Sequence, residues 1–582
     1  MLKTLGAQIK EFKKDSFLTP VFMILEVLME TIIPLMMASI IDNGVEAGDI
    51  HHIYVMGGCM VIVACISLFA GTMGGKYGAR ASAGFARNLR KAMYENIQTF
   101  SFSNIDKFST AGLVTRLTTD VTNLQNAYQM LLRMCVRAPI SLICAMIMAF
   151  FINARLASVY LIAVIVLGMI LAIITVRAHH YFMEVFPKYD DLNASVQENV
   201  SAIRVVKAYV REDYEKKKFT QASKNIYNMF VKAEGVLAFN SPVMQIAVYS
   251  CIIALSWLGA KMIVAGSLTT GELMSLLTYC MNIMMSLMML SMVFVMLAMS
   301  IASAERICEV LNEKSDITNP ENPVYEVADG SVTFDHVTFR YNKTSDKPIL
   351  DDVNLSIRSG ETIGVIGGTG SSKSSLVNLI SRLYDVSEGA VLVGGKDVRS
   401  YDLDTLRDEV SVVLQNNVLF SGTIYENLRW GDKNATDEEC RHACRLACAD
   451  EFIDRFPDGY NTYIEQGGTN VSGGQKQRLC IARALLKKPK ILILDDSTSA
   501  VDTATDAKIR KAFAEEIPNT TKLIIAQRIS SVMNADRIIV LNNGVVDGFG
   551  SHEELMETNA IYREVYESQT QGSGDFDEGG AK

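Results

Sequence analysis

The stretch Gly367-Gly368-Thr369-Gly370-Ser371-Ser372-Lys373-Ser374-Ser375 decides the fold of the second half of this chain. It follows the apolar run Ile363–Ile366, which predicts a buried strand, and it leads into Leu376–Ile380, which predicts a helix. A strand, a glycine-rich turn, a lysine, a hydroxyl residue and a helix in this order are typical of a phosphate-binding loop. Backbone N–H groups and the helix N-terminus converge there on anionic oxygens. In such a loop Lys373 would contact the outer phosphates and Ser374 would bind Mg²⁺.

The residue before the lysine departs from this pattern, because Ser372 stands where glycine is usual. Glycine suits a turn that needs unusual backbone dihedrals or a close approach to a ligand. The side chain of Ser372 adds a Cβ atom where the pyrophosphate would lie. The alternative interpretation is a glycine-rich turn that binds nothing, and the motifs further along the chain argue against it.

Length and composition restrict the class of protein. A chain of 582 residues is too long for one compact domain, so two or three domains are expected. The hydrophobic content of 49% is concentrated before Glu305, and the net charge of −9 argues against nucleic acid as a partner. The 11 Cys residues are scattered, which indicates a reduced compartment rather than a disulfide framework. No cleavable signal peptide is evident.

Long apolar stretches in the first half predict membrane helices. About 20 apolar residues span the hydrocarbon core of a bilayer. Burial in a large soluble core is the alternative, and six such stretches in one half of the chain make it untenable. The expected spans lie between the following residues: Asp15 and Asp42, His52 and Lys76, Arg133 and Ile152, Arg155 and Arg177, Glu234 and Lys261, and Glu272 and Glu305.

Lysine and arginine residues predict the orientation of these spans. The N-terminus and the loops 77–130 and 178–233 are rich in them, whereas the loops 42–52, 153–154 and 262–271 carry none. The basic segments are therefore expected on the cytoplasmic side. An even number of spans returns the C-terminus to the same side.

The chain divides into four predicted parts. Residues 1–311 would form a transmembrane domain with long cytoplasmic loops, in which Ala194–Tyr214 has helical spacing. Residues 312–330 contain two Pro, a Gly and several acidic residues, which is typical of a linker. Residues 331–567 would form a nucleotide-binding domain, and 568–582 a disordered tail rich in Ser, Gly and Asp.

Further phosphate-site elements follow in the second half. The apolar run Ile491–Leu494 predicts a strand that ends in Asp495, whose carboxylate would hold Mg²⁺ through water. The segment Val471-Ser472-Gly473-Gly474-Gln475 precedes this strand. Each element alone is moderately specific, and the combination with the phosphate-binding loop is very specific.

With these motifs the chain resembles the ATP-binding cassette (ABC) exporters, as a half-transporter, from about residue 17 to 567. The resemblance implies a multi-domain fold, a six-helix all-α membrane domain fused to an α/β P-loop cassette, with two such chains in one transporter. Two cassettes would enclose two ATP molecules, each held by the phosphate-binding loop of one chain and the signature of the other. The residues of this chain that would hold its own ATP and Mg²⁺ are Tyr341 against adenine, Gly367, Gly368, Thr369, Gly370, Ser371, Ser372, Lys373, Ser374 and Ser375 around the phosphates, and Ser374, Gln415 and Asp495 at the metal.

The resemblance assigns other residues to the ATP held by the partner chain. Ser472, Gly473, Gly474 and Gln475 are similar to the family signature, with Val471 where Leu is usual, and Ser499-Ala500-Val501-Asp502 is similar to the D-loop that ends in Asp502. In the membrane half, Gly112–Asp120 and Glu198–Tyr214 are similar to the first and second cytoplasmic loops of the family.

Two further positions depart from the family pattern. After Asp495 the family has Glu, which polarises the attacking water, and this chain has Asp496; in the switch loop the family has His, and this chain has Gln527. An Asp carboxylate sits roughly 1 Å short of a Glu carboxylate, and misplacement by about 1 Å can cost on the order of 100-fold in rate. Gln cannot carry a proton near neutral pH. We therefore expect a site that binds ATP and hydrolyses it poorly, with Asp496, Gln527 and Gln415 in the catalytic positions.

An impaired site beside a nearly complete signature predicts a heterodimer. A homodimer would hold two impaired sites, whereas a second half-transporter with Glu and His would have one competent site, completed by Ser472–Gln475 of this chain. The resemblance implies export of an amphipathic or drug-like substrate across a bacterial plasma membrane. The alternatives are a slow homodimeric exporter of lipid or peptide, an ATP-gated channel or sensor on the same fold, and an exporter with its own protease.

Two features of the membrane half bear on a substrate path. Glu26 and Glu30 lie one turn apart in the first span, where charge is costly. They would form a cation-attracting wall or an internal contact with Arg133 or Arg137. The last span is rich in Met, which suits an adaptable pocket or ordinary helix packing; these residues are Met281, Met284, Met285, Met288, Met289, Met292 and Met296.

Overall fold

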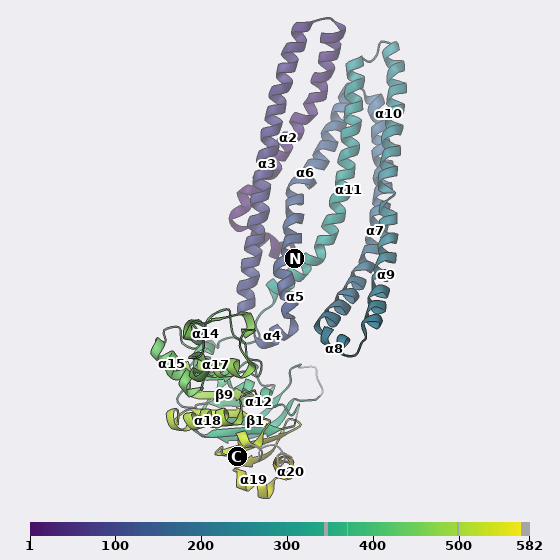
Figure 1. The fold of residues 1–582 in the computed structure, drawn as a ribbon. Helices are drawn as coiled ribbons and strands as arrows, with labels where there is room; N and C mark the ends of the chain where they lie inside the picture. The colour runs from purple at the N-terminus through teal and green to yellow at the C-terminus, as the bar shows by residue number, and fades with distance from the viewer. Residues whose placement is uncertain (343–346, 369, 498–499, 572–582) are drawn as a thin grey trace. The chain divides into compact units, whose positions relative to one another are not determined.

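The computed structural model describes residues 1–342, 347–368, 370–497 and 500–571 (Figure 1). The chain forms two compact units. The helical unit comprises Met1–Thr99 and Phe108–Lys314, and the α/β unit comprises Phe100–Lys107 and the chain from Ser315 onward. An all-α unit, with six candidate membrane helices among its described residues, and a separate α/β unit confirm the predicted fold class.

The helical unit is built from long helices (Figure 1). Among the described residues, six segments are long and apolar enough to cross a membrane: Leu2–Glu46, Ile50–Gln98, Thr110–Ile152, Ala154–Ala178, Glu212–Val264 and Thr270–Phe294. The helices are α1 (Leu2–Gly6), η1 (Ala7–Phe12), α2 (Lys13–Ser39), η2 (Ile40–Glu46), α3 (Ile50–Gln98), α5 (Thr110–Thr115), η3 (Arg116–Asp120), α6 (Val121–Ile152), α7 (Ala154–Ser201), α8 (Ile203–Ala208), α9 (Glu212–Leu237), α10 (Asn240–Val264) and α11 (Thr270–Asn312).

Small residues allow these helices to approach closely. Helix α2 packs against α3, α6 against α11, and α7 against α9 and α10 (Figure 1). On α3, Gly71, Gly74 and Gly78 form a stripe that faces α2, and a Cβ on Gly74 would lie 2.3 Å from the Met23 Cε atom. Lipid offers no hydrophobic driving force between helices, so close packing over such a stripe holds the pair together.

The segment Ala194–Tyr214, predicted from its helical spacing, is helical over most of its length but is divided among three helices. Helix α7 ends at Ser201, and the short helix α8 ends before a left-handed residue, Val210, at φ 52°. There the N–H of Arg211 donates to Val206 O at 3.0 Å, and the N–H of Val210 donates to Lys207 O at 3.3 Å. This pair of bonds closes a helix C-terminus in a turn that usually contains glycine, and the absence of glycine from the segment concealed the break.

The α/β unit contains a buried six-stranded sheet in the order β12-β11-β3-β10-β9-β6, all parallel except β12. On β9, Ile491 and Ile493 face one hydrophobic core, and Leu492 and Leu494 face the other. Burial of both faces explains why such strands are continuous apolar runs in the sequence. The strands are β3 (Thr362–Gly367), β6 (Val410–Val413), β9 (Ile491–Asp495), β10 (Thr521–Ile525), β11 (Arg537–Asn542) and β12 (Val545–Gly550).

Two smaller sheets and short helices complete this unit. One antiparallel sheet has the order β2-β1-β4-β5 and the other pairs β7 with β8. Their strands are β1 (Val332–Phe339), β2 (Leu350–Ile357), β4 (Glu388–Val393), β5 (Lys396–Asp397), β7 (Gly422–Thr423) and β8 (Tyr463–Ile464). The helices are α4 (Phe102–Lys107), α12 (Lys373–Ile380), η4 (Val398–Ser400), α13 (Leu403–Glu409), α14 (Ile424–Leu428), α15 (Asp437–Leu446), α16 (Asp450–Ile453), η5 (Gly459–Asn461), η6 (Gln466–Gly468), α17 (Gly473–Leu486), α18 (Thr503–Glu516), η7 (Ile529–Ser531), α19 (His552–Thr558) and α20 (Ala560–Gln571).

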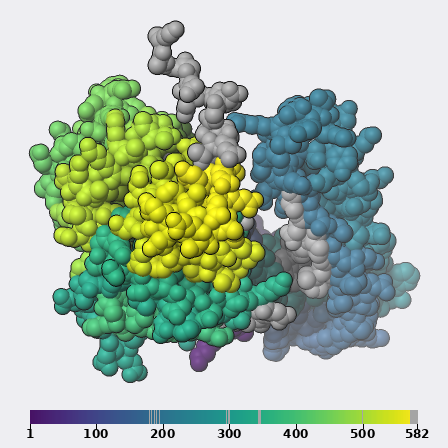
Figure 2. Space-filling view, turned by 90° about the horizontal axis from the view of Figure 1, so that it is seen from below, coloured from purple at the N-terminus to yellow at the C-terminus, as the bar shows by residue number. Residues whose placement is uncertain are grey.

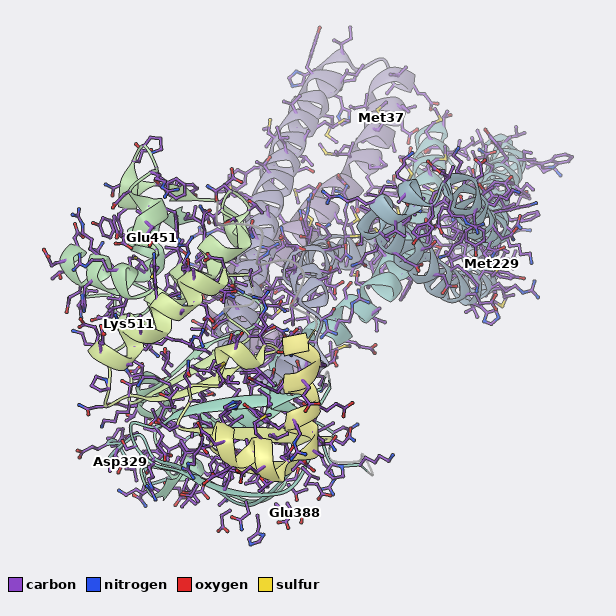
Figure 3. All side chains as sticks on the ribbon, turned by 60° about the horizontal axis from the view of Figure 1, so that its bottom comes forward. Met37, Met229, Asp329, Glu388, Glu451 and Lys511 are labelled. Carbon is purple, nitrogen blue, oxygen red and sulfur yellow. The ribbon has the colours of Figure 1, made fainter. Side chains whose placement is uncertain are left out.

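Helices cover both faces of the six-stranded sheet, because side chains of α12 belong to one hydrophobic core and side chains of α17 to the other. In Figure 3, Asp329 lies just before β1, Glu388 begins β4, and Glu451 and Lys511 lie on α16 and α18. Figure 2 shows the C-terminal segment, in yellow, at the surface of this unit.

Some described residues of the predicted linker and tail take part in the fold of the α/β unit. Within 312–330, Val327 is buried in the core of the α/β unit, and the N–H of Val324 donates to Ser400 O at 2.9 Å. Residues 568–571 of the predicted tail belong to α20, and the rest of that tail lies outside the described residues.

Candidate functional site

The residues predicted to hold the phosphates and Mg²⁺ and to act in hydrolysis lie at the carboxyl ends of parallel strands. The phosphate-binding loop follows β3, Asp495 ends β9, Gln415 follows β6 and Gln527 follows β10. Ile525 pairs with Asp495 on one side and with Val365 on the other, so the ends of these strands are level. Ligands of open α/β sheets bind at this edge.

The phosphate-binding loop is closed around the ammonium group of Lys373. Its Nζ atom donates to Gly367 O and Gly368 O, both at 2.9 Å, and to Ser371 Oγ at 3.3 Å. Burial lowers the pKa of Lys373, and the charges of Asp495 and Asp496 oppose this shift. Lys373 also begins α12, whose first N–H groups lack partners within the helix and carry its positive end.

Ser372 occupies the left-handed backbone region. Its φ is 74° and its ψ is 23°, at the N-cap of α12. This conformation costs a residue with a Cβ roughly 1–2 kcal/mol, which is why glycine is usual there. Gly370 is also left-handed, with φ 83°. Thr369 lies outside the described residues.

Tyr341 is held by other aromatic rings beside the loop. Its hydroxyl oxygen lies 2.9 Å from Ser375 Oγ, and its ring meets those of Phe339 and Tyr384 edge to face, with centroids 4.8 and 5.0 Å apart. The side of Tyr341 away from these rings is open, because the residue is 47% exposed. Tyr384 was not anticipated from the sequence, since no motif marks it.

Asp495 is buried, 5% exposed, next to Ser374 and Lys373. Burial raises the pKa of its carboxyl group, and a hydrogen bond with Ser374 and the charge of Lys373 oppose the shift. A hydroxyl and a carboxylate are oxygen ligands of the kind that Mg²⁺ prefers. Among the described residues, no group of three His, Cys, Asp or Glu side chains is placed to hold a metal.

Asp496 and Gln527 contact each other directly. Gln527 Nε2 donates to Asp496 Oδ2 at 2.7 Å, and Gln415 also hydrogen-bonds the Asp496 side chain. Burial raises the pKa of Asp496, and these two hydrogen bonds oppose the shift. The structure therefore brings together the three residues predicted for the catalytic positions.

The segment Ser472–Gln475 forms the N-terminus of α17. The N–H of Ser472 donates to Gln475 Oε1 at 2.9 Å, and the N–H of Gln475 donates to Ser472 Oγ at 3.3 Å. These reciprocal bonds form a capping box. The spacing of Ser472 and Gln475 is typical of such a box, but it was not predicted from the sequence. A Cβ on Gly474 would lie 2.7 Å from Ala500 O, whereas one on Gly473 would lie 3.6 Å from the Ala500 side chain.

The segment around Ala500 is hydrogen-bonded to α17 and leads into the N-terminus of α18. The N–H of Ala500 donates to Oε1 of the buried Gln477 at 3.0 Å. Asp502 is the N-cap of α18 and accepts from the N–H of Thr505 at 2.9 Å. Ser499, predicted with this segment, lies outside the described residues. Gln477 was missed because its contact joins residues that are distant in the sequence.

In the helical unit, Glu26 and Glu30 form an ion-pair cluster with Arg137. Arg137 Nη1 donates to Glu26 Oε1 at 2.8 Å, and Nη2 donates to Glu30 Oε1 and Oε2 at 2.9 and 3.0 Å. The internal contact was one of the two alternatives predicted for this pair. A pocket of about 590 Å³ lies beside the cluster and is lined by Glu26, Glu30, Arg133 and residues of α3. A role of the two Glu residues in a substrate path remains a prediction.

Comparison with known proteins relates both halves of the chain to one family. Residues 16–303 match the family described as ABC transporter transmembrane region, and residues 350–499 match the family described as ABC transporter. The uncharacterized ABC transporter ATP-binding protein YfiB of Bacillus subtilis is 36% identical over 549 residues, 94% of this chain and 95% of YfiB.

Other relatives carry more specific names. The ATP-dependent lipid A-core flippase of Desulfotalea psychrophila is 32% identical over 84% of this chain and 85% of its own length. The probable multidrug resistance ABC transporter ATP-binding/permease protein YheI of Bacillus subtilis is 34% identical over 72% of each chain. A solved structure of a bacterial Atm1-family ABC exporter with ATP bound superposes with a TM-score of 0.80, at 25% identity, over 96% of this chain and 98% of that one.

Proposed function

Because this chain belongs to the ABC transporter family, with a transmembrane region and an ATP-binding domain in one polypeptide, we propose that it is one half of an ATP-driven exporter whose own nucleotide site binds ATP with Mg²⁺ and hydrolyses it slowly. The hydrogen bond between Gln527 and Asp496 carries this proposal. In the proposal, this neutral amide and this short carboxylate take the positions at which a fast ATPase would have a proton carrier and a longer base.

The residues around the phosphate-binding loop fit a nucleoside triphosphate. Lys373 and the N-terminus of α12 supply positive charge at one point, and the open side of Tyr341 is available to an adenine ring. Ser374, Gln415 and Asp495 would supply the oxygen ligands of Mg²⁺. Lys373 must leave its contacts with Gly367 and Gly368 to reach a phosphate, and the loop then exchanges these hydrogen bonds for bonds to the nucleotide.

Hydrolysis is slow in this proposal because of two side chains. The Asp496 carboxylate is held back from the attacking water by its missing methylene group, and misplacement by about 1 Å can cost on the order of 100-fold. Gln527 can hydrogen-bond a phosphate oxygen, but an amide neither takes nor carries a proton near neutral pH. Burial raises the pKa of Asp496, and this shift does not correct the position of its carboxylate.

The complete cap at Ser472–Gln475 supports a heterodimer. The capping box holds the backbone of this segment, and Gly474 lies close against Ala500. In the proposed transporter it completes the site of a partner half-transporter that carries Glu and His. A homodimeric exporter of lipid or peptide is the second candidate, and the lipid A-core flippase among the relatives favours it.

A methionine face on α11 supports an amphipathic or drug-like substrate. Met281, Met285, Met288, Met292 and Met296 are all exposed, between 37% and 65%, and their spacing places them on one face of the helix. Met284, by contrast, is buried at 1%. Flexible, polarisable side chains adapt to apolar molecules of varied shape. We place this face toward the substrate path, and the relative named for multidrug resistance is consistent with that substrate class.

The proposed setting is a bacterial plasma membrane, with both termini in the cytoplasm. The basic loops of the helical unit and the even number of candidate spans support this orientation. It leaves the α/β unit on the side where ATP is available.

The test uses the full-length chain alone in lipid nanodiscs. We expect it to bind MgATP, to lose that binding in Lys373→Ala, and to release phosphate slowly. Rapid phosphate release by the chain alone would overturn the slow site and the heterodimer together. ATP-dependent uphill uptake of a fluorescent amphiphile into inside-out vesicles, seen with a partner half-transporter, would separate an exporter from a channel or sensor.

A further inference from the structure

A side chain near the C-terminus bridges the loop that carries Gln527. Gln569, in the last turn of α20, donates through Nε2 to the carbonyl oxygen of Gln527 at 2.9 Å. Its Oε1 atom accepts from the N–H of Ile529 at 2.8 Å. One amide thus satisfies a backbone acceptor and a backbone donor two residues apart. We call these two bonds the Gln569 bridge.

Helix α20 is anchored well enough to act as a fixed support. Tyr562 is fully buried, its hydroxyl oxygen lies 2.7 Å from His552 Nδ1, and its N–H donates to Asn559 Oδ1 at 2.7 Å. Val565, one turn further on, packs against the hydrophobic core of the α/β unit. Gln569 therefore extends from a helix whose position is set by the core. Figure 2 shows this C-terminal segment, in yellow, at the surface of the unit, where it is accessible.

The bridge complements contacts that hold the same loop from α18. Arg510 Nη1 donates to Ser530 O at 2.9 Å, and Ser531 Oγ donates to Asp506 Oδ2 at 3.1 Å. These contacts fix the loop beyond Ile529, in η7. The Gln569 bridge fixes the part before it, and the side chain of Gln527 then reaches Asp496 Oδ2 at 2.7 Å.

We propose that Gln569 is a positioning residue that sets the geometry of Gln527 at the nucleotide site, so that the end of α20 controls hydrolysis without contacting the nucleotide. The proposal rests on the proposed function to the extent that Gln527 faces the outer phosphate. Loss of the bridge would free the backbone from Gln527 to Ile529 and let the amide turn away from Asp496. Nucleotide binding, which depends on the phosphate-binding loop, would remain.

The first measurement is hydrogen exchange of the full-length protein without nucleotide, followed at the Ile529 amide. Gln569→Ala removes both bonds, and Gln569→Glu keeps the oxygen that accepts from Ile529 but loses the donor to Gln527. We expect about fivefold faster exchange in Gln569→Ala, the effect of one lost hydrogen bond, and nearly unchanged exchange in Gln569→Glu. Ser568→Ala is the matched control, because its hydroxyl donates to Val565 O within α20.

The second measurement is the rate of phosphate release at saturating MgATP, with its KM. We expect Gln569→Ala to lower kcat on the order of tenfold at unchanged KM, whereas a structural loss would change both. A chain shortened after Gln571 keeps the bridge and should match the full chain, and one shortened after Ser568 should behave like Gln569→Ala.

Two outcomes would overturn the proposal. Unchanged exchange at Ile529 in Gln569→Ala would show that the bridge does not hold the loop. Faster exchange with unchanged kcat would show that the loop does not set the hydrolytic geometry. Failure of the proposed function is a separate result, because it would appear as no MgATP binding or as rapid phosphate release in the unaltered chain, while the exchange data stay interpretable.

Discussion

The hydroxyl group of Tyr384 donates a hydrogen bond to Asp106 Oδ2 at 2.7 Å. Asp106 lies on α4, a segment that interrupts the helical unit in sequence but belongs to the α/β unit. The Tyr384 ring also meets Phe102 of α4, with centroids 6.0 Å apart, and Tyr341 on its other side. Tyr384 therefore contacts both α4 and the ring of Tyr341.

This contact predicts the behaviour of Tyr384→Phe. The variant keeps the ring contacts and loses one hydrogen bond to a carboxylate, which contributes about 1 kcal/mol when partly exposed. We expect roughly fivefold faster hydrogen exchange over 102–107, with MgATP binding unchanged. Asp106→Asn, which can still accept the bond, should show a smaller change. Equal exchange in all three proteins would mean that Phe102 alone holds α4.

The left-handed Ser372 predicts that Ser372→Gly stabilises the α/β unit. Glycine removes a conformational cost of roughly 1–2 kcal/mol and loses part of that gain to its freer unfolded state. We expect a net gain of about 0.5–1 kcal/mol, an increase of roughly 2–3 °C in Tm by calorimetry for a domain of this size. Ser356→Gly, in strand β2 where Ser356 pairs with Thr333, is the control and should lower Tm. A lower Tm in Ser372→Gly would contradict the backbone argument.

The Gln527–Asp496 pair predicts that the double variant Asp496→Glu/Gln527→His gains ATPase activity. It lengthens the carboxylate and supplies a proton carrier, and we expect phosphate release to increase on the order of 10- to 100-fold. Each single variant should gain less, because residues that act together are not additive. Asp496→Asn serves as the inactive reference. If the double variant gains no activity, the cause of slow hydrolysis lies outside Asp496 and Gln527. Ser372 would then be the next position to change.

The packing of the signature on Ala500 predicts different effects of two adjacent substitutions. Gly474→Ala would bring a Cβ to 2.7 Å from a backbone oxygen, so something must shift, whereas Gly473→Ala would make an ordinary contact at 3.6 Å. Both positions lie in the first turn of α17, so the gain in helix propensity is similar. We expect Gly474→Ala to be less stable than Gly473→Ala by about 1–3 kcal/mol in calorimetry. Equal stabilities would mean that the backbone at Ala500 moves aside at little cost, against this prediction.

The ion-pair cluster of the helical unit predicts a strong effect of Arg137→Met. Removal of the guanidinium leaves Glu26 and Glu30 unpaired within the first span, and breaking a buried pair in this way costs about 3–5 kcal/mol. Because Glu30 is partly exposed, we expect a loss of stability near the lower end of this range. We expect a lower unfolding temperature in detergent, measured by fluorescence-detected size exclusion. The triple variant with Glu26→Gln and Glu30→Gln should recover most of the loss, and a failure to recover would assign Arg137 another role.

Much of this architecture could be predicted because it depends on apolar runs. The six spans and the strands β3 and β9 are largely hydrophobic stretches. The motifs at the ends of these two strands located Lys373, Ser374 and Asp495, and the resemblance to the ABC exporters supplied the other site residues. The break at Val210 could not be predicted, because the turn uses a valine where glycine is the usual signal. The capping box of Ser472 was present in the sequence and overlooked, since the same residues were assigned to a ligand.

The residues that position others were missed for a different reason. Tyr384, Gln477 and Gln569 act through contacts with residues that are far away in the sequence. No local pattern marks such side chains, because their partners are determined by the packing of the whole unit. Gln569 also fell in the predicted disordered tail. The Ser, Gly and Asp content of that tail gave no sign that its first residues form the last turn of α20.

The insertion of α4 into the α/β unit means that the polypeptide passes between the two units three times, after Thr99, Lys107 and Lys314. A protease that cut the segment 312–330 would therefore not set the C-terminal half free. The fragment would stay attached through the contacts of Phe102 and Asp106 with Tyr384. After cleavage within 312–330, the contacts of α4 with Tyr384 would still hold the two fragments together. The fragments should therefore elute together in size exclusion until a denaturant separates them.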